Sequence, residues 1–478
     1  ASAGFFFARN RCLRTKALAM LWADSSKADT LVQDYRGPLR TDFSWDMLGR
    51  NTLAVFAREI MLCNQIHDRT IMPILGARWN MAAMTAVAID EWMGASPVYN
   101  ARNRDLHNIQ GDGVDVIMKG FQLDIGAPHM WLEFHYDIKS HDLGYFWLTS
   151  CGAYNHVRAL TGGDPATETQ ICVHMEDPTF DATVMAVNRG ARCTPIFRPP
   201  HGDSIPPEGP CRWQVSIEDR IGAVQANDFT EIVRQTRAGQ FQFSRTGITD
   251  DGLADYSGPF KRDFRLEDLA SSALLAQTKE FALDVHLLQR ACYLSITQRF
   301  GSETIAELIC EHWAAMAPLY QARSRRLFGI EGDDMSAILK LLQLDHHFVP
   351  EYLRTSVELV SPLQGIFRIH DCAALAEGEA GGVLTTLLAG DASGLSQVVA
   401  AVNPRARATR LSRDSAAELA FDILIDPQVD LAARGAPDRR AVPLADRLVA
   451  EQAVVGEAAV GVRHRREIRP AFGAIQVI

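Results

Sequence analysis

The chain of 478 residues contains no run of about 20 apolar residues, so its sequence predicts no membrane-spanning helix. It also has no excess of basic residues. Its 48 Lys and Arg are outnumbered by 58 Asp and Glu, and the formal net charge of −10 argues against a nucleic-acid-binding protein. Hydrophobic residues make up 47% of the chain, which excludes disorder for most of it. We therefore expect a globular protein that binds neither membranes nor nucleic acids.

Standard catalytic and cofactor motifs are absent as well. The sequence has no Walker loop and no Gly-x-Gly-x-x-Gly, so no nucleotide cofactor is predicted, and it lacks Gly-x-Ser-x-Gly and His-Glu-x-x-His. The absence of Cys-x-x-Cys excludes a common zinc finger and a thioredoxin site. The nine cysteines are odd in number and widely spaced, which predicts free thiols and a cytoplasmic location. Basic residues follow the short apolar N-terminal stretch, an order that does not fit a secretory signal.

What the sequence does contain is an internal duplication. Tyr35-Arg-Gly-Pro-Leu-Arg-Thr-Asp-Phe43 reappears as Tyr256-Ser-Gly-Pro-Phe-Lys-Arg-Asp-Phe264, and the match continues without a gap to Cys151 and Cys372. Beyond these cysteines the alignment shifts by a few residues but persists. A unit of this size predicts two homologous repeats and not a solenoid. The predicted parts are an N-terminal segment (1–34), repeat 1 or half 1 (35–240), repeat 2 or half 2 (256–427) and a C-terminal arm (428–478).

Each repeat changes its hydrophobic periodicity part of the way along. Residues 43–124 have the spacing of amphipathic helices, and the corresponding part of half 2 has it more clearly. Later segments of half 1 alternate as strands do, with a helical stretch at 167–188 between them. The predicted strands are 131–138, 143–150, 192–198 and 211–218. This order predicts an α+β fold in which each repeat packs a helical layer on a small mixed or antiparallel sheet.

Half 1 contains a group of His, Cys and acidic residues that half 2 lacks. Because positions shared by both repeats are explained by the fold, those present in half 1 alone are the candidates for function. The candidate catalytic residues are His141, Asp142, His174 and Glu176. The candidate metal ligands are His135, Cys172, Cys193 and Cys211. The structural alternative is that the cysteines are small buried core residues and the histidines hydrogen-bonded packing.

Two kinds of chemistry fit this group. One is a metal site, holding zinc, or iron if the ligands are mainly His and Glu. The other is metal-free acid–base or thiol chemistry, with His141–Asp142 or His174–Glu176 as the proton-transfer groups. A further pair, His346-His347, occurs in half 2 only, where we expect it to be exposed and give it less weight.

The end of half 1 resembles two known families. A strand ends at Cys151, a helix carries Ile171-Cys172-x-x-x-Glu176, the next strand holds Cys193, and the last strand reads Cys211-Arg-Trp-Gln-Val-Ser-Ile217. This order, which covers only the closing portion of the repeat, is similar to four-vinyl-reductase-type small-molecule-binding domains and to the 2-amino-thiazoline-4-carboxylate hydrolase-like family. The resemblance implies aromatic ligands and a zinc held through Cys and Glu, with Cys172 and Cys211 matching best. The long Pro-rich loop before Cys211 departs from the short Gly turn of those families.

From these features we expect a small, largely apolar organic molecule to bind between the helices and the sheet of half 1, with half 2 as scaffold. The first hypothesis is an enzyme of aromatic or organic-acid breakdown, a hydrolase or lyase that a metal could assist. The alternatives are a non-catalytic ligand-binding or sensory protein and a subunit of a larger complex. We also expect the chain to form a homo-oligomer or to join such a complex.

Overall fold

The computed structural model describes residues 33–429 except 203, 219–226, 245–251, 377–380, 413 and 415. Most of the predicted N-terminal segment (1–34) and nearly all of the predicted C-terminal arm (428–478) lie outside the described residues. The described part combines helices with two four-stranded antiparallel sheets, which confirms the predicted α+β class. Within this part, no helix is both long enough and apolar enough to cross a bilayer.

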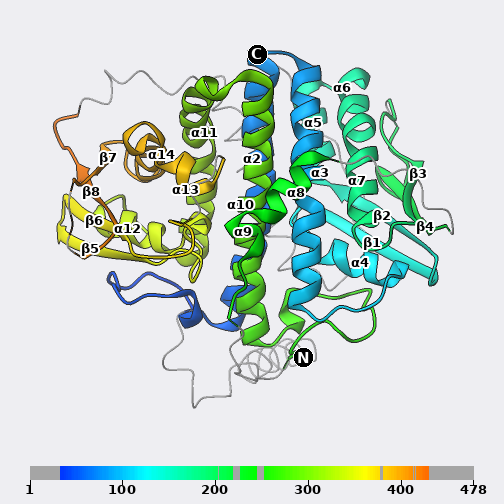
Figure 1. The fold of residues 1–478 in the computed structure, drawn as a ribbon, viewed down its shortest axis with the longest axis horizontal. Coiled ribbons are helices and arrows are strands. Elements are labelled where there is room, and N and C mark those ends of the chain that lie inside the picture. Colours follow the sequence, from blue (N-terminus) through cyan, green and yellow to red (C-terminus); the bar gives the residue numbers. More distant parts are fainter. Residues whose placement is uncertain are drawn as a thin grey trace, which may run out of the picture.

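Four long helices stand in the centre of the molecule, between the two sheets (Figure 1). They are α2 (Arg50–Arg78), α3 (Met81–Leu106), α10 (Ser271–Phe300) and α11 (Ser302–Phe328). Helix α3 begins after Asn80, whose side-chain oxygen accepts a hydrogen bond from the Ala83 amide at 2.9 Å, as an N-cap residue does. Helix α10 packs against both α2 and α3 and is buried on nearly all sides, which places it inside the core.

The sheet of half 1 has the strand order β1-β2-β4-β3, and every pair in it is antiparallel. Its strands are β1 (Leu132–Ser140), β2 (Leu143–Cys151), β3 (Ala191–Phe197) and β4 (Cys211–Ile217). These bounds agree closely with the predicted strands. The shorter elements of half 1 are η1 (Trp45–Met47), α4 (Val114–Gln122), α5 (Gly152–Thr161), α6 (Pro165–Thr169), η2 (Gln170–Met175), α7 (Glu176–Met185), α8 (Asp228–Gln235) and α9 (Arg237–Gln240).

Half 2 repeats this arrangement on the other side of the long helices (Figure 1). Its sheet has the equivalent order β5-β6-β8-β7 and is also antiparallel throughout. Its remaining elements are η3 (Leu266–Asp268), α12 (Met335–Gln343), η4 (His346–Phe348), β5 (Thr355–Ser361), β6 (Gln364–Ile369), α13 (Val383–Leu387), α14 (Ala389–Ala400), β7 (Ala406–Arg410) and β8 (Leu419–Ile425).

The two halves make reciprocal contacts. Arg102 of half 1 donates to Glu280 of half 2 at 3.0 Å, and the equivalent Arg323 donates to Glu59 at 2.8 Å. Both pairs are related by the same offset that aligns the two repeats in the sequence. Two tyrosines repeat the pattern, because Tyr35 donates to Gln343 and Tyr256 donates to Gln122. Such exchanged contacts are typical of a two-fold interface. The helical layers of both halves therefore share one core.

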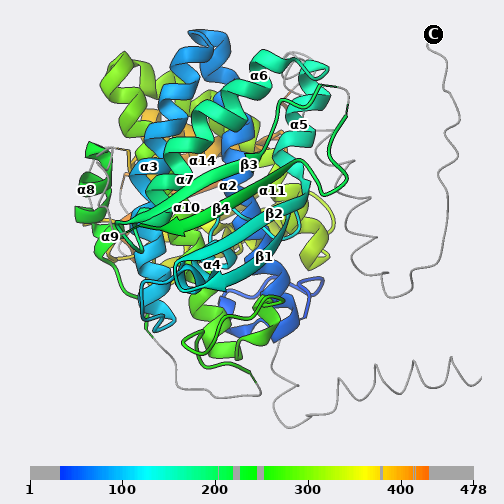
Figure 2. The same ribbon diagram turned by 90° about the vertical axis from the view of Figure 1, so that its right-hand side faces the viewer.

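The two sheets differ in how they join this core. Phe367 and Phe421 of the half 2 sheet belong to the same apolar cluster as the long helices. In half 1, Phe146 and Trp213 belong instead to a second cluster, which the sheet forms with α4 and α7. Figure 2 shows the four strands of this sheet and the helices α4 and α7 beside them. The apolar packing is therefore interrupted between the half 1 sheet and the central helices, and this gap is where the candidate site lies.

Candidate functional site

A cavity of about 170 Å³ lies in half 1 between the sheet and the helices α2, α3 and α7. Most of its wall is apolar and aromatic, which is typical of sites that bind small organic molecules. The apolar side chains that line it include Trp92, Phe121, Leu132, Phe134, Leu148, Phe180 and Trp213. The cavity therefore has the location that the sequence predicted for a ligand.

A few polar groups face this apolar space. Three carboxyl groups line the cavity, those of Asp68, Asp124 and Glu176, together with the guanidinium of Arg69. Burial raises the pKa of Glu176 to about 8. Burial also raises the pKa of Asp124, to about 6, although hydrogen bonds from the Gly126 amide and the Tyr99 hydroxyl oppose the shift. Glu176 is thus largely protonated at neutral pH, whereas most Asp124 carboxyls are ionised.

An irregular helical turn places Glu176 at the cavity. Residues Gln170–Met175 form a π-helix, η2, that runs directly into the first residue of α7. The wider turn brings Ile171, Met175 and Glu176 to the cavity wall together. Pro178 lies near the start of α7 and does not interrupt the helical chain, which runs continuously from η2 into α7. Such π-bulges often occur at functional sites.

Half 2 fills the equivalent space with its own side chains. His347 and Phe348 occupy the positions equivalent to Gly126 and Ala127, which line the half 1 cavity. The His347 ring lies 4.5 Å from the Trp313 ring, between centroids, and Trp313 is equivalent to Trp92. A Cβ added at Gly126 would come within 2.8 Å of the Trp92 ring, so glycine keeps this side of the cavity open.

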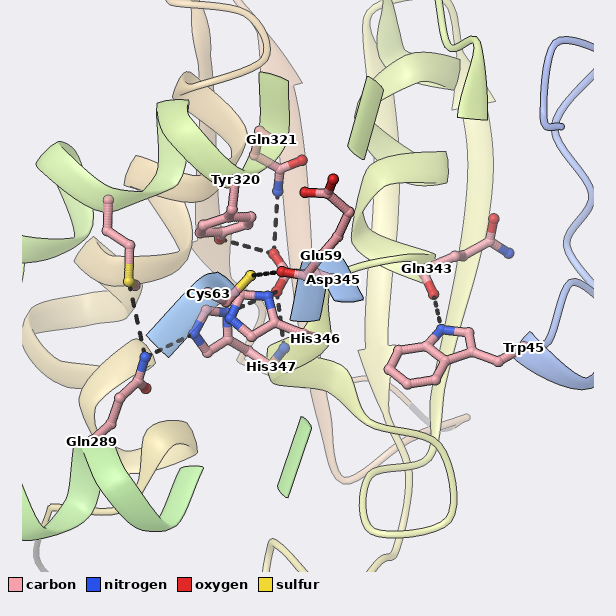
Figure 3. A network of polar contacts seen from close by, with 11 residues as sticks. Trp45, Glu59, Cys63, Gln289, Tyr320, Gln321, Gln343, Asp345, His346 and His347 are labelled. Carbon is pink, nitrogen blue, oxygen red and sulfur yellow. Dashed lines mark hydrogen bonds and ion pairs between the residues drawn. The ribbon is translucent and has the colours of Figure 1, made fainter. Parts of the chain in front are cut away.

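A hydrogen-bond network holds His347 in place (Figure 3). Asp345, the equivalent of Asp124, accepts from the Tyr320 hydroxyl at 2.9 Å and bonds His347 Nδ1 at 2.7 Å. Gln289 lies 3.3 Å from the other ring nitrogen of His347. The expectation that His346-His347 is exposed was wrong, because both side chains are buried against Tyr320 and Trp313. His346 and His347 are therefore core residues of half 2.

Of the residues that the sequence singled out, Glu176 and Cys211 line the cavity. Cys172 is buried close to both, and burial followed by the charge of Glu176 raises the pKa of its thiol. Cys193 is buried on β3 in the core between the sheet, α4 and α7. His174 is exposed on η2, away from the carboxyl of Glu176 that faces the cavity.

His135 lies on the other face of the sheet. Its side chain is 41% exposed, its ring stacks on Trp147 at 5.4 Å, and its Nε2 lies 3.1 Å from the Thr149 hydroxyl. Strand alternation puts Glu133, His135 and Asp137 on one face, but this is the face opposite the cavity. The structure does not bring His135 together with Cys211, so these two residues cannot ligate one ion in this arrangement.

His141 and Asp142 form the exposed turn between β1 and β2, at the end of the hairpin far from the cavity-lining Leu132 and Cys151. His141 Nδ1 lies 2.6 Å from the Asp142 carboxylate, and this hydrogen bond raises the pKa of the imidazole. We expect His141→Ala to shift the midpoint of thermal unfolding by no more than about 2 °C, because the ion pairs of His141 with Asp142 and Asp112 are exposed and such pairs contribute little. Calorimetry checks this. A larger decrease would show that the turn stabilises the sheet more than an exposed pair does.

A second group of polar residues lies deeper, and the sequence interpretation missed it. His67, Glu91 and Cys292, from α2, α3 and α10, bring one ligating atom each within 4.8 Å of one another. Asp68 connects this group to the cavity, since it lines the cavity wall and lies close enough to Glu91 for the charge of Glu91 to raise its pKa further, after burial. The sequence did contain a sign of this group, because His67 and Glu91 differ from their equivalents in half 2, which are Leu288 and His312. Only the comparison of the two helical parts would have revealed it.

The fold and the cavity together define the class: an α+β protein of two similar halves, with a largely apolar cavity beside a helical core that both halves share. Comparison of the chain with protein-family models, with curated proteins and with solved structures finds no match. The functional argument therefore rests on the geometry of this site.

Proposed function

We propose that this protein is an enzyme that binds a small aromatic or otherwise apolar organic acid in the half 1 cavity and acts on it as a hydrolase or lyase. One observation carries the proposal: an apolar cavity in which two of the three carboxyl groups have different pKa values, Glu176 near 8 and Asp124 near 6. Pairs of titratable groups whose surroundings separate their pKa values are typical of acid–base catalysis.

The size and lining of the cavity restrict the ligand. A cavity of about 150 Å³ in another protein binds benzene, so 170 Å³ suits one aromatic ring with a small substituent. Arg69 lines the same space, and its guanidinium is the natural partner for a carboxylate on the ligand. These features favour an aromatic acid over a neutral hydrocarbon.

The chemistry follows from which groups can give up a proton. A protonated Glu176 in an apolar site can donate a proton to a leaving group at neutral pH, as a general acid does. The thiols are poor nucleophiles, because burial raises the pKa of Cys151 to about 12 and that of Cys211 as well. We therefore assign the chemistry to Glu176 and not to a cysteine.

Half 2 serves as a scaffold in this proposal. We infer that the halves descend from one duplicated unit, a view supported by their equal strand order and their reciprocal contacts. In half 2, His347 and Phe348 take the space that a ligand would need. One copy then keeps the site while the other stabilises it.

A non-catalytic ligand-binding protein is the second candidate, and one observation favours it. Asp124 accepts a hydrogen bond from Tyr99 at 2.8 Å, and Asp345 repeats this contact with Tyr320 in half 2. A contact present in both halves is explained by the fold, so Asp124 needs no catalytic role. Of the carboxyl groups that line the cavity, Asp68 and Glu176 then remain, and a binding protein requires neither of them as an acid.

The experiment is to screen turnover of small aryl esters, aryl amides and substituted benzoates by the wild-type protein and by Glu176→Gln. We expect Glu176→Gln to reduce turnover by about 10²- to 10⁴-fold, the contribution of a general acid, while substrate binding stays within a few-fold. The reason is that glutamine keeps the size of the side chain and removes the proton that it donates.

Asp177→Asn is the matched control. Asp177 is the next residue on α7 but pairs with Arg198 outside the cavity, at 3.0 Å. Its charge helps to raise the pKa of Glu176, so its loss should lower that pKa slightly and change turnover by no more than a few-fold. Equal turnover by wild type and Glu176→Gln would contradict the catalytic assignment. Compounds that bind to the cavity without any turnover would favour the binding protein.

A further inference from the structure

Three long helices each contribute one metal-binding side chain to a single point in the core. His67 Nε2 lies 3.2 Å from Glu91 Oε1, and the thiol of Cys292 completes the group, with all three ligating atoms within 4.8 Å. The side chains of His67 and Glu91 are fully buried, and Cys292 is buried as well. No residue of the predicted metal set belongs to this group.

These buried polar atoms also lack well-formed hydrogen bonds. Among the described residues, neither ring nitrogen of His67 has a partner in hydrogen-bonding geometry, and the Glu91 carboxyl interacts only with the neighbouring side chains of Asp68 and Cys292. A buried polar group without a partner costs about 1–3 kcal/mol, and a charged one costs more. A bound cation that accepts electron pairs from His67 Nε2 and a Glu91 oxygen would satisfy these two atoms and remove part of this cost.

The donor set and its charge fit zinc. A tetrahedral Zn²⁺ with Zn–N and Zn–O bonds of about 2.0–2.1 Å places its N and O ligands roughly 3.3 Å apart, close to the observed 3.2 Å. Neutral imidazole, carboxylate and thiolate together carry a charge of −2, so the Zn²⁺ ion and its three ligands would together be electrically neutral. Neutrality matters here because an uncompensated charge in this core would be costly.

The repeat that relates the two halves does not produce a second copy of this group. The positions equivalent to His67, Glu91 and Cys292 are Leu288, His312 and Ile71. Two of these three residues are apolar, and the third, His312, bonds the Tyr293 hydroxyl at 2.8 Å. The fold therefore does not require a polar trio at this place.

We propose that His67, Glu91 and Cys292 bind one zinc ion in the helical core, beside the half 1 cavity. The three protein ligands leave one position of a tetrahedron open, as in catalytic zinc sites. Asp68, which lies beside Glu91 and lines the cavity, is the group between the ion and the ligand space. The site is independent of the acid–base role proposed for Glu176.

The test uses the full chain, refolded with ZnCl₂, freed of loose metal and analysed for its elements. We expect about one zinc per chain in the wild type, with affinity reduced more than about 100-fold in Cys292→Ser. That loss exceeds the roughly 10- to 100-fold typical of residues that only support a ligand. The matched control is Cys172→Ser, which removes another buried thiol and should keep the zinc.

A second measurement covers the case in which Cys292→Ser fails to fold. Wild-type protein refolded with Co²⁺ should show the intense near-ultraviolet absorption of a cobalt–thiolate bond, together with the visible bands of a tetrahedral ion. Absence of zinc and of this absorption would overturn the proposal. Loss of the metal in Cys172→Ser but not in Cys292→Ser would overturn it as well and move the site to the sheet cysteines.

Discussion

Ala127→Phe is expected to abolish ligand binding in the half 1 cavity while the protein stays folded. Ala127 is buried in the cavity wall, and half 2 already has phenylalanine, Phe348, at the equivalent position. A phenyl ring that enters the cavity of about 170 Å³ leaves no room for a second ring. Isothermal titration with benzoate, or with the best ligand of the aryl panel, should show affinity reduced by at least 100-fold.

The reciprocal variant provides the control for this experiment. Phe348 packs on Phe367, with ring centroids 4.7 Å apart, and both rings are buried. Phe348→Ala should therefore lower the free energy of unfolding by about 3–5 kcal/mol, as other buried Phe→Ala changes do, and leave binding to half 1 intact. If Ala127→Phe binds benzoate as wild type does, the ligand site is not this cavity.

The second large effect is a loss of stability between about pH 4.5 and pH 8 that originates from Glu176. Burial raises the folded-state pKa of this carboxyl to about 8, above its ordinary value of 4.5. The folded state thus holds the proton more tightly than the unfolded chain does. This contribution is complete below about pH 4.5 and is lost as the pH rises through 8.

From pH 6 to pH 9.5, the free energy of unfolding contributed by Glu176 falls mainly between pH 6 and pH 8. These two pH units correspond to about 2–3 kcal/mol. Chemical denaturation across this range measures it. Glu176→Gln cannot ionise, so its free energy of unfolding should fall less than that of the wild type, by this amount. If the free energy of unfolding had the same pH dependence in both proteins, the pKa of Glu176 would not be raised by folding. The general-acid role would then lose its basis.

Much of the architecture could be predicted from the sequence. The alternation of Trp131-Leu-Glu-Phe-His-Tyr-Asp-Ile138 predicted β1, and the constant offset between the repeats predicted two halves of like element order. Period and turn residues are local signals, and they are strong where a strand or helix has one buried face. That is why the predicted strand positions agree closely with the observed ones.

The site was predicted only in part, because its members come from elements far apart in the chain. Glu176 and Cys211 were chosen from half 1-specific residues near the last strands, and both line the cavity. His135 was chosen for the same reason but lies on the outer face. A strand pattern states that alternate residues share a face, and it does not state which face the helices cover.

What the sequence by itself determined is the secondary structure, the equal element order of the halves and the surplus of reactive side chains in half 1. What only the tertiary structure decided is where these side chains meet. Packing of α10 against α2 and α3 brings Cys292 of half 2 to His67 and Glu91 of half 1. Packing also decides that a cavity lies beside Gly126 in half 1, whereas His347 fills the equivalent space in half 2. Both outcomes depend on contacts between distant helices and sheets, which no local periodicity encodes.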